Sequence, residues 1–361
     1  MSKPARLVRL LAPLSALALL GGCGMVVMHP MGDVALQQRD LVLIATALML
    51  LIVIPVLALI ALFAWRYRSS NEDATYTPDW DHSTQLELMI WGAPLLIIIC
   101  LGAVTWTGTH LLDPYRPIGR IAAGRPVPAN AKPLEVQVVA LDWKWLFIYP
   151  EYGFATVNEL AAPVDRPIKF RLTSSSVMNA FYVPTLAGMV YTMPSMETKL
   201  HAVINTPGVY RGISANYSGA GFSGMHFQFY GMKDADFAGW VARNQGAGGD
   251  LSRARYLDLV KPTQTVPVMR FAHVAPGLFD AVVGQCVEPG TPCMSAMMKQ
   301  DGSDTAGMTH MQGMGTPAGP KAVSPLTTSR AGGAPPGKPG DIAQRSPSAP
   351  SHATPPHQSA L

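Results

Sequence analysis

Cysteines are the residues of this chain with the most direct chemistry, and its four cysteines lie in different settings. Cys23 follows two glycines after a short apolar run, and Cys100 lies inside a long apolar segment. Cys286 and Cys293 enclose the short segment 287–292. Such different settings do not form a single disulfide framework. For Cys286 and Cys293 we expect a disulfide if this part of the chain faces an oxidising compartment. A metal pair is the weaker alternative, because no histidine lies near them.

Cys23 also completes a secretion signal. Lys3, Arg6 and Arg9 form a positive N-terminal region, and the apolar run 10–20 that follows is too short to span a bilayer. The sequence Leu-Gly-Gly-Cys at its end resembles a bacterial lipobox, in which the cysteine thiol takes a diacylglycerol. We therefore predict a cleaved signal peptide at 1–22 and a lipidated N-terminal segment at 23–40. The alternative is an ordinary cleavage site followed by a chance cysteine.

A second group of soft ligands lies near the end of the chain. Thioethers suit Cu(I), and methionines and one histidine cluster at Met294, Met297, Met298, Met308, His310, Met311 and Met314. The tail 299–361 is rich in Gly, Pro, Ser, Thr and Ala and has few core-forming residues, which is typical of a disordered segment. We prefer the compositional interpretation of this cluster over a copper site.

Other chemistry is not indicated. The sequence has no nucleophile elbow, no His-Glu-x-x-His zinc motif and no phosphate-binding loop. We therefore predict no catalytic residues and no metal ligands in this chain. The net charge of +4 is small and no Lys/Arg-rich run occurs, which argues against a nucleic-acid partner.

Two apolar segments are predicted to anchor the chain in a membrane. Segments 41–65 and 88–109 contain no charged residue, and at about 1.5 Å per residue each can cross a hydrocarbon core about 30 Å thick. Buried core helices are the alternative for either segment. A transmembrane hairpin at 41–109 follows, with Pro55 expected to kink its first span. A lipidated Cys23 on the outer face places everything after residue 109 outside, and Arg66 and Arg68 on the inner loop agree.

The chain beyond the hairpin is predicted to be mostly β. Segment 134–138 alternates apolar and polar residues, and the run to Tyr149 is rich in β-branched and aromatic residues. Segments 167–172, 198–204, 208–214 and 225–230 are similar, with turn signals between them. Short strands at this spacing predict a β sandwich or barrel. Segment 237–259 is predicted to be helical.

Three segments then resemble one family. Segments 142–150, 173–179 and 213–225 resemble subunit II of the haem-copper oxidases, most closely its cytochrome bo-type ubiquinol oxidase branch. The resemblance implies a membrane-anchored α+β chain, in which the two-helix hairpin precedes a cupredoxin-like Greek-key β sandwich. The corresponding domains are a periplasmic cupredoxin-like domain at 110–232 and a helical, aromatic extension at 233–298.

The resemblance also implies what the site has lost. In the cytochrome c oxidases this domain holds two coppers through a Cys-x-x-x-Cys-x-x-x-His-x-x-Met pattern, a Glu carbonyl and an earlier His. The ligand positions here hold Asn179, Ser214, Asn216, Ser218 and Phe222, and Met225 alone is kept. Neutral hydroxyls and a phenyl ring cannot replace thiolate and imidazole. His226 is displaced by four positions and is expected on the opposite strand face from Met225.

The resemblance therefore implies a non-catalytic subunit II of a proton-pumping quinol:O2 oxidoreductase in the bacterial inner membrane. Its expected partners are the haem-copper catalytic subunit I, which holds the haems and the remaining copper, further oxidase subunits, membrane lipid and, through the complex, ubiquinol. Trp143, Trp145 and Phe147 are then expected to pack the sheet or a subunit interface. Two alternatives are a cytochrome c oxidase subunit with its own copper, which the missing ligands oppose, and a lipoprotein that delivers copper to an oxidase.

Overall fold

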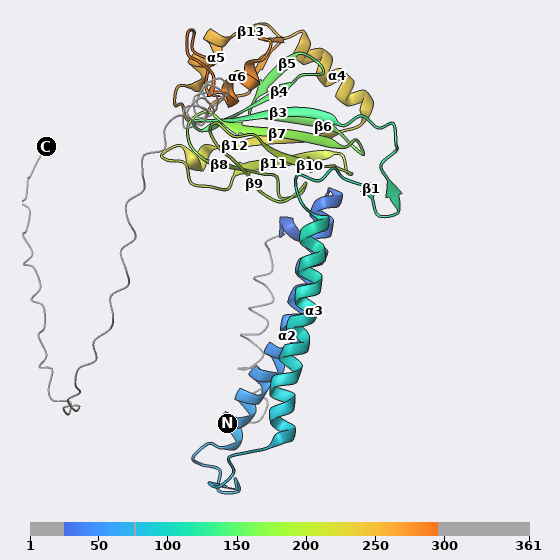
Figure 1. The fold of residues 1–361 in the computed structure, drawn as a ribbon, viewed down its shortest axis with the longest axis vertical. Helices are drawn as coiled ribbons and strands as arrows, with labels where there is room; N and C mark the ends of the chain where they lie inside the picture. Colours follow the sequence, from blue (N-terminus) through green and yellow to red (C-terminus); the bar gives the residue numbers. More distant parts are fainter. Residues whose placement is uncertain (1–24, 76, 295–361) are drawn as a thin grey trace, which may run out of the picture. The chain divides into compact units, whose positions relative to one another are not determined.

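A computed structural model describes residues 25–75 and 77–294 (Figure 1). The predicted signal peptide, Cys23, the tail 299–361 and the Met/His cluster beyond Met294 lie outside the described residues.

Two long helices follow a short 3-10 turn, η1 (Val26–Met28). They are α2 (Asp33–Arg66) and α3 (Thr84–Leu111), and both are long and apolar enough to cross a membrane. α2 continues through Pro55 as one helix. The two helices pack closely at Gly108, where a Cβ atom would meet Leu41 Cδ2 at 2.9 Å.

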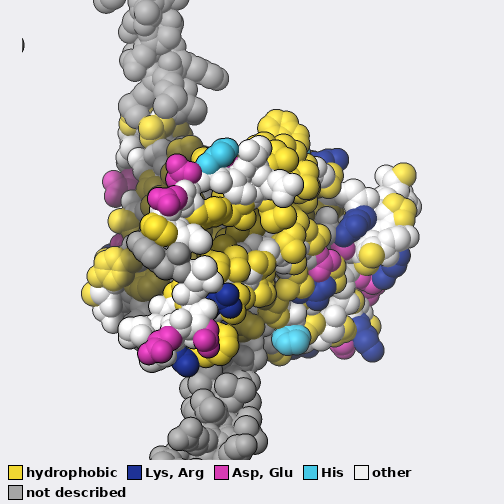
Figure 2. Space-filling model, turned by 90° about the horizontal axis from the view of Figure 1, so that it is seen from below, with side chains coloured by type: hydrophobic (Ala, Val, Ile, Leu, Met, Phe, Trp, Pro, Cys, Tyr) yellow, Lys and Arg dark blue, Asp and Glu magenta, His cyan; other side chains and the backbone are white. Residues whose placement is uncertain are grey.

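In the view of the molecule from below, hydrophobic side chains fill the middle of the face and charged side chains lie around them (Figure 2).

Two sheets form the sandwich. The first has six strands in the order β10-β7-β3-β4-β5-β14 and the second has five in the order β6-β12-β11-β8-β9. The strands of the first sheet are β3 (Leu134–Leu141), β4 (Lys144–Tyr149), β5 (Phe154–Val157), β7 (Ile168–Ser174), β10 (Thr198–Ala202) and β14 (Met269–Phe271). Those of the second are β6 (Glu159–Pro163), β8 (Asn179–Tyr182), β9 (Val190–Thr192), β11 (Gly208–Ser214) and β12 (His226–Met232). β3 pairs with β7, and β6 with β12, in parallel, while the other pairs are antiparallel.

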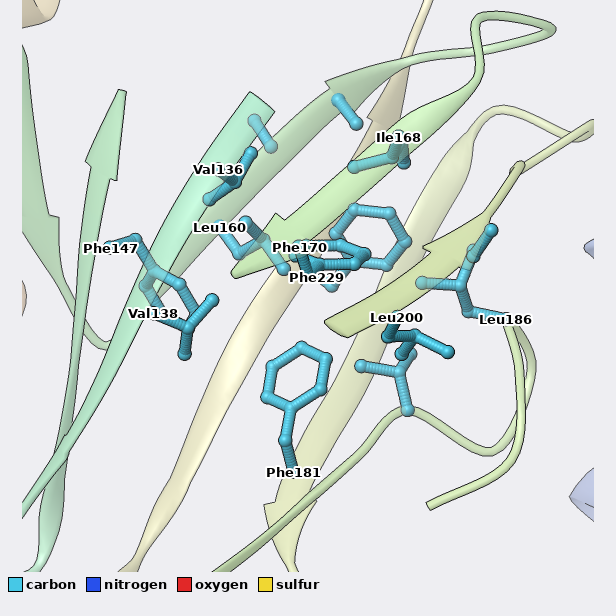
Figure 3. Close-up of a cluster of buried hydrophobic side chains, with 14 of the residues drawn as sticks. Val136, Val138, Phe147, Leu160, Ile168, Phe170, Phe181, Leu186, Leu200 and Phe229 are labelled. Carbon is cyan, nitrogen blue, oxygen red and sulfur yellow. The ribbon is translucent and has the colours of Figure 1, made fainter. Parts of the chain in front are cut away.

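The core lies between the two sheets. Val136 and Val138 from β3 and Phe147 from β4 point toward Phe181 of β8 and Phe229 of β12 (Figure 3). Alternate residues of β3 and β4, such as Leu141 and Leu146, belong to a second buried cluster on the outer face of the first sheet. Both faces are covered from Val138 onward, so the rest of β3 and all of β4 except Lys144 are apolar.

The sequence-predicted strand run from 134 to 149 is divided in the structure. β3 and β4 form an antiparallel pair, with Asp142 and Trp143 in the turn between them. Trp143 adopts a positive φ of 63°, a conformation uncommon for a residue with a side chain. The alternation analysis missed β5, β6, β8 and β9, because these strands have only three to five residues and most are buried on both faces.

The extension follows β12, and its part from Leu251 onward covers the outer face of the first sheet, whereas Phe237, Trp240 and Val241 pack in the core between the sheets. It contains α4 (Asp234–Gln245), α5 (Arg253–Val260) and α6 (Leu278–Val283), with β13 (Asp250–Leu251) and β15 (His273–Val274) paired in parallel. The prediction of one helix over 237–259 is wrong in its middle, because α4 ends at Gly246 and Gly249 adopts φ 102°. Tyr256 and Phe279 of the extension pack in the second buried cluster.

Smaller elements complete the described chain. A two-stranded sheet of β1 (Arg120–Ala122) and β2 (Arg125–Pro126) follows α3, and a 3-10 turn, η2 (Phe222–Gly224), precedes β12. Gly32, which caps α2, forms an isolated antiparallel bridge with Ile204. The start of α2 is thereby joined to the sandwich.

Candidate functional site

The residues at the lost ligand positions lie together at one end of the second sheet. Asn179 begins β8 and Ser214 ends β11, and these two strands are hydrogen-bonded neighbours. Asn216 and Ser218 follow in the loop after β11, and Met225 directly precedes β12. Two loops that are distant in sequence therefore meet at the place that corresponds, by the resemblance, to the copper centre of the cytochrome c oxidases.

A hydrogen-bond network now occupies this place. Ser214 Oγ donates to Asn179 Oδ1 at 3.1 Å, and Asn179 Nδ2 donates to the Val177 carbonyl at 3.2 Å. Asn216 Nδ2 donates to the Met178 carbonyl at 3.1 Å. Asn179 is 1% exposed and Ser214 is 4% exposed, so these polar groups depend on one another for partners. The network closes the site with neutral side chains.

The donor set does not fit a copper pair. Met225 is buried, and its sulfur lies 4.0 Å from Ser218 Oγ. Phe222 is at the histidine position and packs edge-on against Tyr217, with ring centroids 5.6 Å apart. Within residues 25–75 and 77–294 no three His, Cys, Asp or Glu side chains come together as metal ligands do. A single thioether among hydroxyls and amides offers neither the thiolate nor the imidazole that copper requires.

His226 lies apart from the buried side of this site. It is the first residue of β12, pairs with Ile213 and is exposed, whereas the preceding Met225 is buried. The two side chains thus differ in exposure as expected for opposite faces of the strand.

Trp143 covers the loop that carries the former ligand positions. Its Nε1 donates to the Ser218 carbonyl at 2.9 Å. A Cβ atom at Gly221 would lie 2.3 Å from the Trp143 ring, so only glycine fits there, and Gly219 adopts φ 107°. Trp145 and Phe147 instead lie fully buried between the sheets, where Trp145 packs edge-on against Phe181 with centroids 5.5 Å apart. The prediction that Trp145 and Phe147 pack the sheet is confirmed.

Lys144 is a buried group that sequence reasoning missed. Its side chain is 1% exposed, and Nζ donates to the Lys261 carbonyl at 2.9 Å and to Thr263 Oγ1 at 2.6 Å. Burial lowers the pKa of Lys144. The sequence feature that could have revealed this group is the position of the lysine between two tryptophans. A lysine is rarely fully buried unless polar partners accept its hydrogen bonds. Its contacts tie the turn after β3 to the extension.

Arg171 on β7 ties another part of the extension to the sandwich. It donates to Glu197 at 2.7 Å and to Asp280 of α6 at 3.2 Å, and its guanidinium lies 4.9 Å from the centre of the Phe279 ring. The hydrogen bond from Arg171 lowers the pKa of Glu197. Buried Glu159 of β6, in the second sheet, accepts from Trp240 Nε1 of α4 at 2.7 Å and pairs with Arg270 of β14.

Cys286 and Cys293 lie beside each other after α6. Their Cα atoms are 4.8 Å apart, and the structure joins their sulfur atoms. Cys100 is exposed and free on α3. The pairing of Cys286 with Cys293 stays a prediction, as does lipidation of Cys23, which is outside the described residues.

Family comparisons agree with this fold. Residues 153–229 match the family described as cytochrome c oxidase subunit II, periplasmic domain. Residues 245–290, which form most of the extension, match the COX aromatic rich motif.

Curated relatives match most of the chain. Cytochrome bo(3) ubiquinol oxidase subunit 2 of Pseudomonas putida is 48% identical over 75% of this chain and 83% of its own length. The protein of the same name from Pseudomonas aeruginosa is 49% identical over 73% of this chain and 77% of its own length. Ubiquinol oxidase subunit 2 of Acetobacter aceti is 47% identical over 78% of this chain and 89% of its own length. Since these relatives are so similar over most of their length, the chain belongs to the family of ubiquinol oxidase subunit 2.

Proposed function

We propose that this chain is the copper-free, non-catalytic subunit II of a proton-pumping quinol:O2 oxidoreductase in the bacterial inner membrane. The observation that carries the proposal is the network of Asn179, Ser214 and Asn216 at the place of a copper centre. The names of the relatives, all ubiquinol oxidase subunits, support it.

The electron donor follows from the chemistry of the site. A soluble one-electron carrier that docks on the outer domain needs a redox centre there, and the donor set at 179–225 fits none. A membrane-dissolved quinol avoids this requirement, because it can reach the membrane-embedded catalytic subunit directly. That subunit would hold the haems and the copper of the complex, with ubiquinol as the donor and O2 as the acceptor.

The physical role of this chain would be support. Its helices carry large exposed hydrophobic side chains, such as Leu51 at 63% and Trp91 at 78% exposure. Lipid can cover these side chains, and so can the transmembrane helices of subunit I and further oxidase subunits. The sandwich, held to the start of α2 by the Gly32–Ile204 bridge, would then cap the outer face of the catalytic subunit.

The proposed topology is a lipoprotein with two spans. Cys23 would carry the lipid at the outer face, α2 would run inward and α3 would return. The exposed apolar surface of both helices supports this placement.

The test is the donor preference and metal content of the purified intact complex. We expect ubiquinol-driven O2 reduction, haem that co-purifies with this chain, and the copper content of the catalytic subunit alone. Two additional coppers per complex, or oxidation of cytochrome c as fast as that of quinol, would contradict the proposal. Purification of this chain without haem would favour a free-standing lipoprotein.

A further inference from the structure

A hollow lies where the hairpin meets the sandwich. It has a volume of about 410 Å³, within the range of about 300–1,000 Å³ typical of ligand pockets. Its wall is mixed polar and apolar. The polar side chains come from three parts of the chain: Asp33, Gln37 and Gln38 of α2, Asp113, Arg116 and Arg120 after α3, and His201 of β10.

A second hollow continues from the first along the hairpin. It has a volume of about 490 Å³ and shares Gln37, Leu111, Leu112 and Arg120 with the first. Most of the rest of its wall is apolar and includes Leu41 and Ile44 of α2 and Val104 and Gly108 of α3. The two hollows together form a junction groove, which is mixed polar and apolar at the sandwich and mainly apolar along the helices.

The depths of the two parts match the layers of a bilayer. The charge-free segments begin at Leu41 on α2 and end at Thr109 on α3, so the apolar part would lie in the outer half of the hydrocarbon core. Arg116 and Arg120 lie a few residues beyond that boundary, at headgroup level. Exposed Trp106 and Tyr115 flank the same boundary, as aromatic residues do at membrane interfaces.

Arg116 is exposed and lines the first hollow together with Asp113. Arg120 donates to buried Asp33 at 2.8 Å and Arg39 pairs with Asp40, but Arg116 has no carboxylate partner among the described residues. It donates to the His110 carbonyl at 3.3 Å. The turn Asp113–Arg116, closed by the Arg116 N–H bond to the Asp113 carbonyl at 3.1 Å, holds it at the groove. A guanidinium so placed can bind a phosphate through two parallel hydrogen bonds.

We propose that the junction groove binds one phospholipid of the outer leaflet, with its phosphate on Arg116 and an acyl chain along Leu41, Ile44 and Val104. The inference rests on the proposed membrane placement of the hairpin. The lipid would fill the angle between α2, α3 and the sandwich, and so stabilise the junction.

Native mass spectrometry of the intact oxidase complex tests the proposal. Complexes are washed in detergent and then offered phosphatidylethanolamine or phosphatidylglycerol with 16- and 18-carbon chains. We expect wild type to retain one more phospholipid per complex than Arg116→Ala, and Arg116→Lys to retain it at about tenfold lower affinity. The matched control is Arg211→Ala, which removes an exposed arginine on β11 and should retain the full number.

A second variant tests the apolar part of the groove. Val104→Trp fills it and should lose the same lipid while the phosphate site stays intact. If Val104→Trp fails to assemble, a photo-cross-linking residue at position 104 replaces it and should capture a phospholipid.

Three results would overturn the proposal: equal lipid numbers in wild type and Arg116→Ala, a cross-link from position 104 to a helix of another subunit, or a cross-link to the acyl group of Cys23. Haem content and quinol oxidase activity are measured on the same samples. If these are normal while lipid retention is unchanged, the lipid site is wrong and the proposed function stands.

Discussion

At the scale of single residues, the site is a packed polar loop at the positions that correspond to copper ligands in the cytochrome c oxidases. The buried side chains of Asn179 and Ser214 are hydrogen-bonded to each other. The Trp143 ring packs on the loop at Gly219 and Gly221. Metal binding often contributes to the folding free energy of a site. Here the order of the loop depends on hydrogen bonds and on the fit of Trp143.

Gly221→Ala should destabilise this loop. The new Cβ atom would overlap the Trp143 ring, whose nearest atom is 2.3 Å from the Cβ position, and overpacking of this kind costs about 1–3 kcal/mol. The unfolding temperature of the complex, followed through the fluorescence of the outer domain, measures the effect. Gly224→Ala is the matched control in the same loop, because its nearest atom is 3.8 Å away. Equal unfolding temperatures for both variants would mean that Trp143 does not constrain the loop.

Glu197→Gln should destabilise the sandwich in a pH-dependent way. The Arg171 hydrogen bond lowers the pKa of Glu197, so its stabilising contribution is present above the unfolded-state pKa and is lost as the pH falls through the lower folded-state pKa. At pH 7 we expect a loss of about 1 kcal/mol, because the pair is only partly buried. The difference from wild type should shrink below about pH 4.

Thermal unfolding at pH 7 and at acidic pH measures this difference. Asp258→Asn is the control, since it removes an exposed ion pair with Lys261 and should have no measurable effect. A Glu197→Gln difference that is constant across pH would rule out the carboxylate charge as its cause.

At the scale of elements, the extension from Leu251 onward acts as a third layer on the first sheet. Arg171 holds α6, Glu159 holds α4 and β14, and Lys144 holds the segment between α5 and β14. These contacts explain why β3 and β4 are apolar on both faces: one face packs against the second sheet and the other against the extension.

Cys286 and Cys293 should form a disulfide at the end of this layer. In the native, unreduced complex, neither cysteine should react with a thiol reagent after denaturation, and both should react after reduction. Closing so short a loop contributes about 2 kcal/mol in the chain-entropy description, so Cys286→Ser with Cys293→Ser should lower the stability of the extension by that amount. Cys100 is the internal control, because it should be labelled without reduction.

At the scale of the whole molecule, a short junction joins the apolar helical hairpin to the β sandwich. Met31 and Gly32 both donate to the Thr185 carbonyl, and Asp33 is buried beside Arg120. A Cβ atom at Gly32 would lie 2.5 Å from the Val203 carbonyl oxygen, so the close approach of α2 to the sandwich requires glycine. The outer domain is therefore held against the start of α2 instead of hanging from a free linker.

Cys23 should be the mature, lipid-modified N-terminus. Mass spectrometry of the N-terminal peptide should show residues 1–22 removed and the Cys23 thiol carrying diacylglycerol. Cys23→Ser should leave assembly and quinol oxidation intact, because two spans anchor a chain far more firmly than acyl chains do. Retention of residues 1–22 in the wild-type protein would refute the lipobox interpretation.

The sequence by itself determined the features that depend on local composition. Two charge-free segments predicted the apolar helices. Period-two alternation predicted the first half of β3, residues 134–138, because only one face is buried there and the residue types alternate accordingly. The resemblance to subunit II indicated which positions correspond to copper ligands, since a metal site requires particular atoms at particular spacings.

Only the tertiary structure decided what depends on groups distant in the chain. The positive φ of Trp143 follows from the loop that packs beneath it, and buried Lys144 is tolerated because Lys261 and Thr263 supply oxygens more than a hundred residues away. The junction groove has the same origin, since α2, the end of α3 and β10 line it together. Such contacts leave no periodic record in the sequence, because each is set by how separate elements pack.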